Sequence, residues 1–226
     1  MKFGVVIAAG GKGTRFGTDI PKQFVEVCGA PILSYTIDKF EKSPSVSEIV
    51  IVSHKDYLVY CSDIVKSFGF SKVTAITEGG NTRQQSVLKG LKALSNDTDY
   101  VLIHDAARPF VSIETIEACC KETVKHGACA AGTKAVDTLK ISQDGEFITA
   151  TADRDKIWHI QTPQCFDKDF IIQCHKNAVF EALEATDDCA LAEHYGAKIK
   201  LLDAGRENLK ITNYCDLAVA EVLLGD

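Results

Sequence analysis

The sequence lacks a long hydrophobic run, and its cysteines do not form a pattern typical of a metal site or a disulfide framework. No apolar stretch in the 226 residues approaches the roughly 20 needed to span a bilayer. Glycines and charges follow the apolar start at once, which is not typical of a signal peptide. The nine cysteines include no C-x-x-C pair, and Cys119, Cys120 and Cys174 lie in apolar helical segments. We expect a cytoplasmic protein with no membrane partner and with reduced thiols packed as small hydrophobes.

An excess of basic charge is also absent. Lysine and arginine number 25 against 31 acidic residues, which gives a formal net charge of −6. Proteins that bind a nucleic-acid backbone usually carry a basic surface, so we expect no nucleic-acid partner. A small phosphorylated ligand remains compatible with this balance, because local basic residues can act within an acidic whole.

The two standard phosphate-binding motifs are missing from the glycine-rich stretch "AAGGKGTRFG" near the start. A P-loop would need glycine at position 6 and Ser or Thr after Lys12, but these positions hold Val6 and Gly13. The dinucleotide fingerprint, counted from Gly11, would need glycine where Phe16 stands. Glycines still allow backbone N–H groups to face phosphate oxygens. Arg15 and Lys22 then add a fork of donors and a point charge, which suits a polyphosphate.

What is present is a regular alternation of strand-like and helical segments. Residues 3–9, 48–53, 72–77 and 100–106 are short, apolar and rich in β-branched residues, as strands buried on both faces are. Helical spacing occurs over 32–42, 57–68 and 82–94, and over 113–126 with Ser112 as its cap and Gly127 as its stop. The pattern predicts an α/β fold, a Rossmann-like doubly wound and mostly parallel sheet, over a single domain 1–226.

In such sheets ligands bind beyond the carboxyl ends of the strands, which selects the glycine-rich loop and "HDAARPF". Asp105 in the second loop is a candidate Mg²⁺ ligand, since Mg²⁺ is held by one or two carboxylates plus phosphates. Alternatively Asp105 caps the next turn or pairs with Arg108. His104 is more typical of a packed histidine at a strand end than of a base.

Residues 134–153 interrupt the alternation. Two extended segments flank Asp144-Gly145, a strong hairpin signal. An isolated hairpin is marginally stable, so its apolar residues require a partner surface, either on their own domain or on a second subunit. We expect a projecting β-hairpin arm.

Several other polar residues lie in predicted loops, and none of them by itself indicates a particular function. Thr186 has an alternative role as the N-cap of the helical segment that follows it, and Thr162-Pro163 could start a turn. The residues of this set are Thr138, Arg154, Thr162, Thr186 and Lys210. No nucleophilic triad is visible, and a substrate phosphate needs none, because its oxygens are already anionic.

Taken in order, the motifs resemble the 2-C-methyl-D-erythritol 4-phosphate cytidylyltransferase family over roughly residues 3–222. They are "AAGGKGTRFGTDIPKQF", "GGNTRQQSV", "HDAARPF", "AVDTLK", "DRDKIWHIQTPQCF", "ATDDCALAEHYG" and "ENLKIT". The resemblance implies a nucleotidyltransferase fold of the nucleotide-diphospho-sugar type. It further implies CTP and a polyol phosphate as substrates, a Mg²⁺ requirement, and a homodimer formed through the arms.

The resemblance also implies roles for individual residues. Arg15 and Lys22 would stabilise the transition state at the α-phosphorus, and Arg154 and Lys210 would position the attacking phosphate, Arg154 in the other subunit's site. The nucleotide-binding set is Ala8, Ala9, Gly10, Gly11, Gly13, Gly80, Asn81 and Ser86. The substrate-binding set is Arg108, Thr138, Arg154, Thr162, Thr186 and Lys210, and Asp105 matches the metal ligand.

Two alternatives remain open. A sibling family activates ribitol 5-phosphate with CTP, but its members tend to differ inside "HDAARP" and lack the "WH" pair. Ala106-Ala107 and Trp158-His159 favour methylerythritol phosphate. A catalytically silent nucleotide-binding module would not need Arg15 and Lys22 together.

Overall fold

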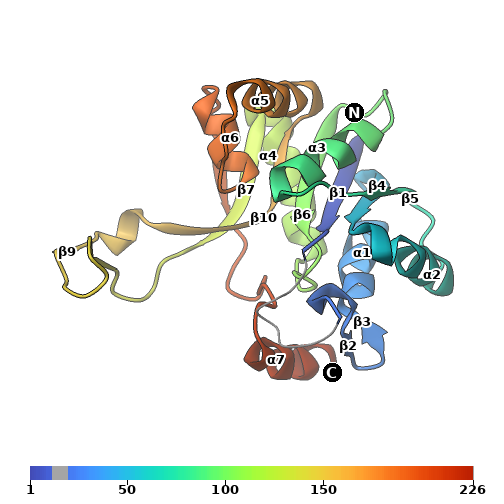
Figure 1. The fold of residues 1–226 in the computed structure, drawn as a ribbon, viewed down its shortest axis with the longest axis horizontal. Helices are drawn as coiled ribbons and strands as arrows, with labels where there is room; N and C mark the ends of the chain where they lie inside the picture. Colours follow the sequence, from blue (N-terminus) through green and yellow to red (C-terminus); the bar gives the residue numbers. More distant parts are fainter. Residues whose placement is uncertain (12–19, 226) are drawn as a thin grey trace.

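A seven-stranded sheet with helices on both faces forms the body of the protein in this computed structural model, which describes residues 1–11 and 20–225 (Figure 1). The strand order is β11-β7-β10-β6-β1-β4-β5. Every neighbouring pair is parallel except those of β10, which runs antiparallel to β6 and β7. The strands are β1 (Phe3–Ala9), β4 (Val46–Ser53), β5 (Val73–Glu78), β6 (Tyr100–Asp105), β7 (Ala128–Lys134), β10 (Trp158–Asp167) and β11 (Lys200–Asp203). The expected α/β, mostly parallel architecture is confirmed.

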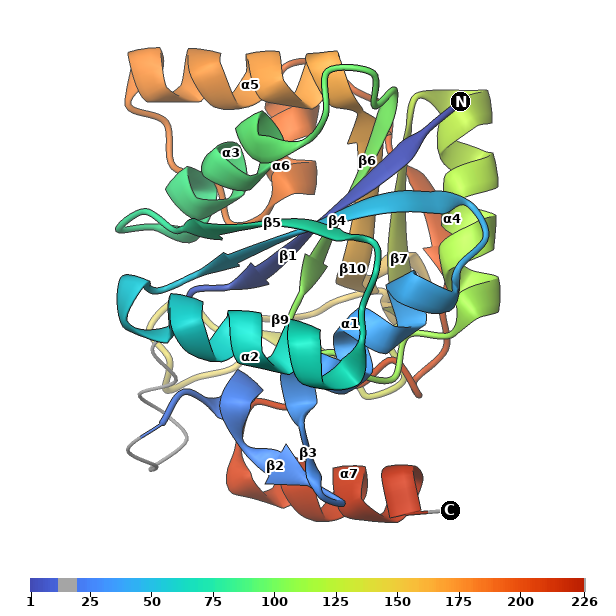
Figure 2. The same ribbon diagram turned by 90° about the vertical axis from the view of Figure 1, so that its right-hand side faces the viewer.

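The helices divide between the two faces of the sheet (Figure 2). One face carries α1 (Ile32–Lys42), α2 (Leu58–Phe68) and α4 (Ile113–His126), and the other carries α3 (Arg83–Ala93), α5 (Lys168–Glu181) and α6 (Asp188–His194). Successive residues of β1 pack into the two cores on opposite faces of the sheet. Val5 and Ile7 pack into the core with α1, α2 and α4, whereas Val6 packs into the core with α3 and α5.

The ends of two helices follow local signals. Helix α4 spans the predicted residues, with the Ser112 hydroxyl accepting from Thr115 N and Gly127 in the left-handed conformation at φ 83°. The predicted cap of α6 is wrong: Asp187, not Thr186, accepts from Ala190 N. An ionised carboxylate is a strong acceptor for the free N–H groups of a first turn, and here it stands one residue closer to the helix.

Helix α3 lies unusually close to the sheet. A Cβ at Gly90 would lie 2.5 Å from Val6 and 2.6 Å from Val52, so only glycine fits at this crossing. The close approach fixes the start of α3 and the preceding loop above the carboxyl ends of β1 and β4.

A smaller unit lies beyond the carboxyl ends of the strands. It consists of the short 3-10 helix η1 (Lys22–Phe24), the paired strands β2 (Glu26–Val27) and β3 (Ala30–Pro31), and the C-terminal helix α7 (Tyr214–Gly225). Val27, Ile32, Ile211, Leu217 and Ala220 form its core. Ile211 belongs to this core, so the segment before α7 is held close to the carboxyl ends of the strands. A further 3-10 helix, η2 (Lys55–Tyr57), precedes α2.

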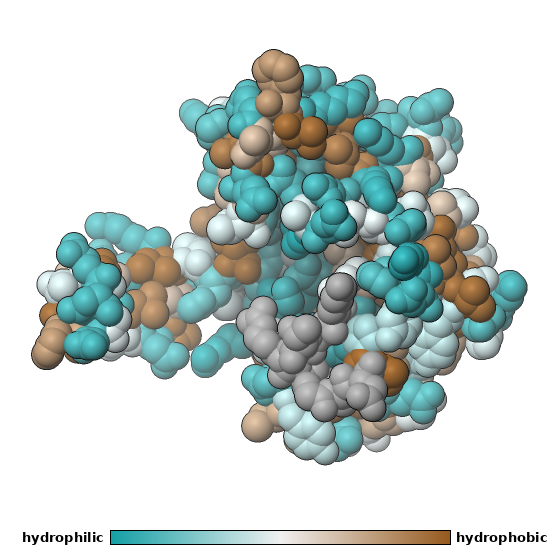
Figure 3. All heavy atoms as spheres, in the orientation of Figure 1, coloured by the Kyte–Doolittle hydropathy of each residue, from teal (hydrophilic) through white to brown (hydrophobic). Residues whose placement is uncertain are grey.

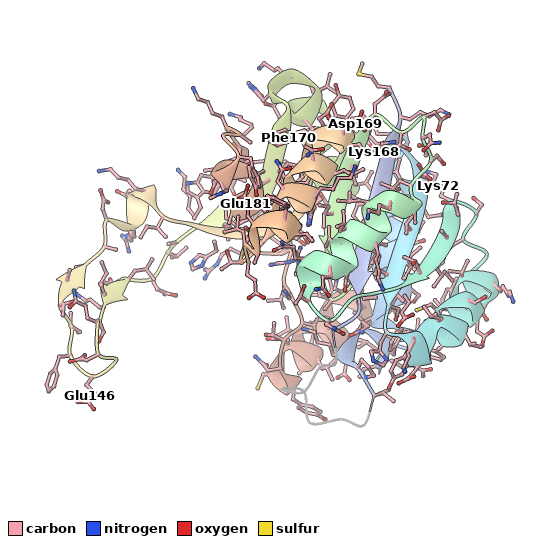
Figure 4. The ribbon with its side chains drawn as sticks, turned by 45° about the horizontal axis from the view of Figure 1, so that its top comes forward. Lys72, Glu146, Lys168, Asp169, Phe170 and Glu181 are labelled. Carbon is pink, nitrogen blue, oxygen red and sulfur yellow. The ribbon has the colours of Figure 1, made fainter. Side chains whose placement is uncertain are left out.

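The arm projects away from the sheet (Figure 1) and contains β8 (Lys140–Ile141), β9 (Ala150–Thr151) and the 3-10 helix η3 (Arg154–Lys156). Its paired strands are only two residues each, shorter than two extended segments around Asp144-Gly145 would suggest. The Asp144 carboxylate instead accepts from Glu146 N and Phe147 N, which holds a wide turn. Glu146 lies at the tip, far from Lys168 and Phe170 on α5 (Figure 4).

Candidate active site

The candidate site lies where the parallel strands end. Its floor is formed by Gly10 and Gly11 after β1, the loop from Gly79 to Thr82 before α3, the turn after β6, and residues 208–211 after β11. This is the edge at which ligands bind in open α/β sheets.

Asp105, the last residue of β6, is surrounded by three cationic side chains. Its Oδ2 lies 2.7 Å from Lys210 Nζ and 3.8 Å from Arg108 Nε, and its Oδ1 lies 3.7 Å from Arg83 Nε. Burial opposes ionisation of this carboxyl, but the charges of Lys210 and Arg83 outweigh it and hold the pKa of Asp105 far below its usual range. Asp105 therefore does pair with Arg108, and this pair is one part of a larger cluster of cations around the carboxylate.

Arg83, the first residue of α3, was not singled out from the sequence. Its Nη1 donates to Asp188 Oδ2 at 2.7 Å, and His175 Nε2 lies 3.1 Å from Asp188 Oδ1. Burial of Asp188 raises its pKa, but the Arg83 charge and the His175 hydrogen bond outweigh this and lower the pKa overall. A chain of alternating charge therefore runs from α6 through Arg83 to Asp105 and Lys210. The Arg83–Asp188 pair and the Asp105–Lys210 pair each join residues 105 apart in sequence, so spacing does not reveal them.

Lys22 and Lys210 approach the same short segment. Lys22 Nζ donates to the carbonyl of Ile211 at 2.6 Å, and Lys210 precedes that residue. The Ile211 amide donates to Ala107 O at 2.9 Å, so the segment is fixed to the turn after β6. Lys22 thus contacts the residue that follows Lys210, whose own Nζ pairs with Asp105.

The predicted nucleotide loops also meet. A Cβ at Gly10 would lie 3.7 Å from Ser86 Oγ, and that hydroxyl accepts from Gly80 N at 3.0 Å. Gln23, which the sequence interpretation missed, donates from its side chain to Ala9 O at 2.5 Å and Gly11 O at 3.1 Å. Ala8, the residue before Ala9, accepts from Ala106 N through its carbonyl at 3.1 Å. Asn81, beyond Gly80, is exposed.

A pocket of about 240 Å³ opens beside Lys210 and Arg108. Its lining is rich in basic groups, including Lys134, His159 and Arg206. Within the described residues, buried Arg108 Nε and Asn208 Oδ1 have no hydrogen-bond partner. A larger groove of about 480 Å³ between α2 and β5 is mainly aliphatic, and no predicted site residue within the described ranges lines it.

Thr162 lies inside β10, next to the site, and the prediction that it starts a turn is wrong. It precedes a cis peptide bond to Pro163 and is 3 % exposed. Its Oγ1 accepts from Asp105 N at 3.1 Å and lies 3.0 Å from His104 Nδ1. His104 is fully buried, and that burial lowers its pKa to about 4. The ring is therefore neutral near pH 7, in keeping with the expected packed histidine.

Three predicted residues lie apart from this cluster within one chain. Thr138 is exposed on the arm, and Arg154 lies in η3 of the arm, where its Nη1 donates to Val136 O at 2.9 Å. Thr186 is exposed just before α6. Arg15 and Gly13 lie outside the described residues.

For a metal, the described residues offer no group of three or more His, Cys, Asp or Glu placed to hold an ion. Asp105 is an ionised oxygen donor at the centre of the site. This fits Mg²⁺, which is commonly bound through one carboxylate with phosphate oxygens and water completing its shell. Nowhere in the described ranges is a helix both long and apolar enough to cross a membrane.

Comparison with known proteins gives the family. Residues 3–226 match the family described as IspD: 2-C-methyl-D-erythritol 4-phosphate cytidylyltransferase. The chain belongs to this family. Among curated cytidylyltransferases of that name, it is 44% identical to that of Clostridium novyi over 97% of this chain and 95% of the relative. It is 46% identical to that of Clostridium acetobutylicum over 97% of this chain and 96% of the relative.

Solved structures of the family have the same fold. The 4-diphosphocytidyl-2C-methyl-D-erythritol synthase from Anaerococcus prevotii superposes with a TM-score of 0.87 at 31% identity, covering 100% of this chain and 96% of that one. The 2-C-methyl-D-erythritol 4-phosphate cytidylyltransferase from Thermus thermophilus superposes with a TM-score of 0.81 at 29% identity, with 100% of each chain covered. The resemblance inferred from the motifs is confirmed.

Proposed function

We propose that this protein transfers the cytidylyl group of CTP to 2-C-methyl-D-erythritol 4-phosphate, forming CDP-methylerythritol and releasing pyrophosphate. Family membership across the whole chain carries this proposal. The cationic cluster at the ends of β1 and β6 supports it. A reaction between two anions requires positive groups that offset their repulsion.

The chemical step needs no enzymic nucleophile. A phosphate oxygen of methylerythritol phosphate attacks the α-phosphorus of CTP, and the bond from that phosphorus to the pyrophosphate oxygen breaks. We assign Lys22 and Arg15 to the charge that develops at the α-phosphorus. Lys210 and Arg108, which line the basic pocket, hold the attacking phosphate. Arg108 Nε is buried and lies 3.8 Å from Asp105 Oδ2, but it has no hydrogen-bond partner within the described residues, which supports a polar ligand near this pocket.

The nucleotide lies, in this proposal, over the end of β1 and the glycines that follow it, which contribute Ala8, Ala9, Gly10, Gly11 and Gly13. Gly80, Asn81 and Ser86 contact the cytosine and ribose. Gln23 keeps the carbonyls of Ala9 and Gly11 engaged, so that the neighbouring N–H groups face outward. Asp105 would hold Mg²⁺, which would offset triphosphate charge. Lys210 Nζ lies 2.7 Å from Asp105 Oδ2, and Lys210 lines the pocket assigned to the substrate phosphate.

We further propose that the chain acts as one domain in a homodimer, with the arm 134–153 as the dimerisation element. Ile141, Phe147 and Ile148 are 49%, 70% and 67% exposed on the arm, and its apolar surface is visible in Figure 3. A second copy would cover these side chains. It would also place Arg154 and Thr138 in the partner's site, beside the partner's copies of Thr162 and Thr186. The reaction then takes place in the cytoplasm, where CTP is available.

An assay of pyrophosphate release tests the function. CTP with Mg²⁺ and methylerythritol phosphate should release pyrophosphate, and omission of either the polyol phosphate or the metal should abolish it. Ribitol 5-phosphate is the matched comparison, because the sibling family uses it with CTP, whereas Ala106-Ala107 and Trp158-His159 favour methylerythritol phosphate here. Faster turnover of ribitol phosphate would overturn the proposal, and binding of CTP without turnover of either polyol would make the protein a silent module.

A further inference from the structure

The basic pocket beside Lys210 lies on the side of the site away from the glycine-rich loop. Its lining comes from the end of β7, residues 136–137 at the root of the arm, the start of β10, residues 206–210 after β11, and Arg108. Strands β7, β10 and β11 lie on the other side of β6 from β1 and β4. Within the described ranges, no residue of the loops after β1 or before α3 lines the pocket. Its position therefore suits the second substrate and not the nucleotide.

The lining of this pocket carries more positive than negative charge. Asp137 is the only carboxylate that the described part of the chain contributes to it. The cationic side chains that line it are Arg108, Lys134, Arg206 and Lys210. An excess of positive charge in a confined space favours an anionic ligand.

Arg206 differs from the other three cations because it has no internal partner. Lys210 and Arg108 belong to the ion-pair cluster described above. Lys134 Nζ lies over the Trp158 ring, 5.8 Å from its centre. Arg206 is exposed, and its guanidinium has no ion-pair or hydrogen-bond partner among the described residues. Its N–H donors remain for a ligand, and the planar fork that they form fits two phosphate oxygens at once.

The acidic neighbour of Arg206 does not neutralise it. The Glu207 side chain folds back over Gly205, where an added Cβ would collide with the Glu207 carboxylate. Glu207 does not line the pocket. The positive charge of Arg206 is therefore available to a ligand there.

The turn that carries Arg206 is anchored at both ends by one buried side chain. Gln161 is 6 % exposed on β10; its Nε2 donates to Gly205 O at 3.2 Å, and its Oε1 accepts from Asn208 Nδ2 at 3.0 Å. The Asp203 carboxylate accepts from Gly205 N at 3.1 Å. Gly205 has a left-handed φ of 71°, which turns the chain directly before Arg206. The backbone at Arg206 is therefore fixed before any ligand binds.

We propose that Arg206 is a further substrate-binding residue, whose guanidinium holds the phosphate of the polyol phosphate together with Lys210 and Arg108. This role rests on the proposed function and adds a third cation to the side of the attacking phosphate. A phosphate monoester carries about 1.5 to 2 negative charges near pH 7. Lys210 already pairs with Asp105, so Arg206 supplies positive charge that no internal carboxylate offsets. That charge lowers the cost of bringing the polyol phosphate beside the triphosphate.

Steady-state kinetics of three variants test this role. Arg206→Gln removes the charge, and Arg206→Lys keeps the charge without the fork. The control Lys198→Gln removes an exposed positive charge just before β11, at the end of that strand away from the pocket. Arg206→Gln should raise KM for methylerythritol phosphate about tenfold, with kcat and KM for CTP nearly unchanged. Arg206→Lys should give a smaller rise, and Lys198→Gln should match the wild type.

Two kinetic results would overturn the proposal. An equal rise in KM for CTP would mean that Arg206 acts on both substrates through its charge and does not hold one phosphate. An unchanged KM for methylerythritol phosphate in Arg206→Gln would remove Arg206 from the substrate site.

Arginine modification by phenylglyoxal gives a readout that needs no turnover. Exposed Arg206 should react in the free protein, and mass spectrometry of its peptide would follow the reaction. In the presence of a CTP analogue that cannot react, methylerythritol phosphate should protect Arg206. The analogue alone should not protect it, and neither should erythritol, which has no phosphate.

The outcomes of this experiment separate the role of Arg206 from the proposed function. Failure of both methylerythritol phosphate and ribitol 5-phosphate to protect Arg206 would overturn the proposal even if the transferase is active. Protection by ribitol 5-phosphate alone, or protection by methylerythritol phosphate without turnover, would support the role of Arg206 and count against the proposed function.

Discussion

Arg83 Nη1 lies 2.7 Å from Asp188 Oδ2, and this ion pair joins the start of α3 to the start of α6. The Asp188 side chain is 2 % exposed, so its charge depends on the Arg83 cation for compensation, and His175 adds a hydrogen bond. Removing one partner of a buried pair leaves the other charge uncompensated. The Arg83–Asp188 pair therefore fixes the position of the Arg83 guanidinium, the cation that faces Asp105 from α3.

We expect Asp188→Asn to lower the free energy of unfolding by about 3 kcal/mol, measured by urea denaturation. The matched control is Asp38→Asn, which breaks an equally short 2.7 Å pair with Lys42 on the exposed face of α1. Exposed pairs are screened by solvent, so the control should lose less than about 1 kcal/mol. Similar losses in both variants would show that the Arg83 pair is not buried in the folded protein.

The same substitution should change the pH dependence of stability. The pKa of Asp188 is lowered by folding, so the unfolded chain binds more protons and this carboxylate stabilises the fold at neutral pH. That contribution is lost as the pH falls below the unfolded value of about 3.9 toward the folded one. The decline in unfolding free energy between about pH 5 and 3 should be shallower in Asp188→Asn than in the wild type. Parallel profiles would contradict this.

Lys22→Ala should depress kcat far more than it weakens CTP binding, because we assign Lys22 to charge that develops only in the transition state. Stopped-flow or steady-state kinetics with calorimetric CTP affinities would separate the two effects. Lys121→Ala, on the exposed surface of α4, removes one positive charge away from the site and serves as the control. Equal losses in kcat and in CTP affinity would make Lys22 a docking residue.

The fold could be predicted where its causes are local. Helix α4 begins after Ser112 and ends before Gly127 as expected, because a cap and a left-handed glycine act on adjacent backbone. Strands β7, β10 and β11 were not predicted. The sequence of β7, ACAAGTK, has little β propensity, and β10 contains Pro163. Their place in the sheet comes from tertiary pairing, including the antiparallel insertion of β10.

The residues of the candidate site also divide into those that the sequence could predict and those that it could not. Asp105, Lys22 and Lys210 were predictable from motif and strand end, and the fold does bring them together. Arg83, Asp188 and Gln23 were not, because their roles arise from contacts between distant segments. Thr162 was placed at the site, where its hydroxyl accepts from Asp105 N and lies beside His104.

Alkylation should modify only two of the nine cysteines in the folded protein. Cys28 and Cys215 are exposed, and the other seven are buried. Burial raises the pKa of Cys61 and of Cys165 to about 11, so these thiols are poor nucleophiles near neutral pH. Mass spectrometry after iodoacetamide should show two labels on the native protein and nine after denaturation. Native labelling of a Cys28→Ser, Cys215→Ser double variant would contradict the packed-thiol prediction.

Shortening the arm over residues 139–148 should give a monomer by light scattering, because the apolar arm side chains would lose their partner surface. The point variant Phe147→Ser, Ile148→Ser should act in the same direction. The control Val179→Ser, Phe180→Ser removes equally exposed apolar groups from α5 and should leave the dimer intact. A dimer that survives loss of the arm would remove the arm from the interface.

Mixing two inactive variants then tests whether the arm completes the partner's site. Arg154→Ala and Lys210→Ala chains should each be inactive as homodimers. If Arg154 acts in the partner's site, one of the two sites in a mixed dimer has both residues intact. Random exchange of subunits should then restore roughly a quarter of the wild-type activity, since half the dimers are mixed and half of their sites are complete. No recovery, with exchange verified by mass spectrometry, would place Arg154 in the site of its own chain.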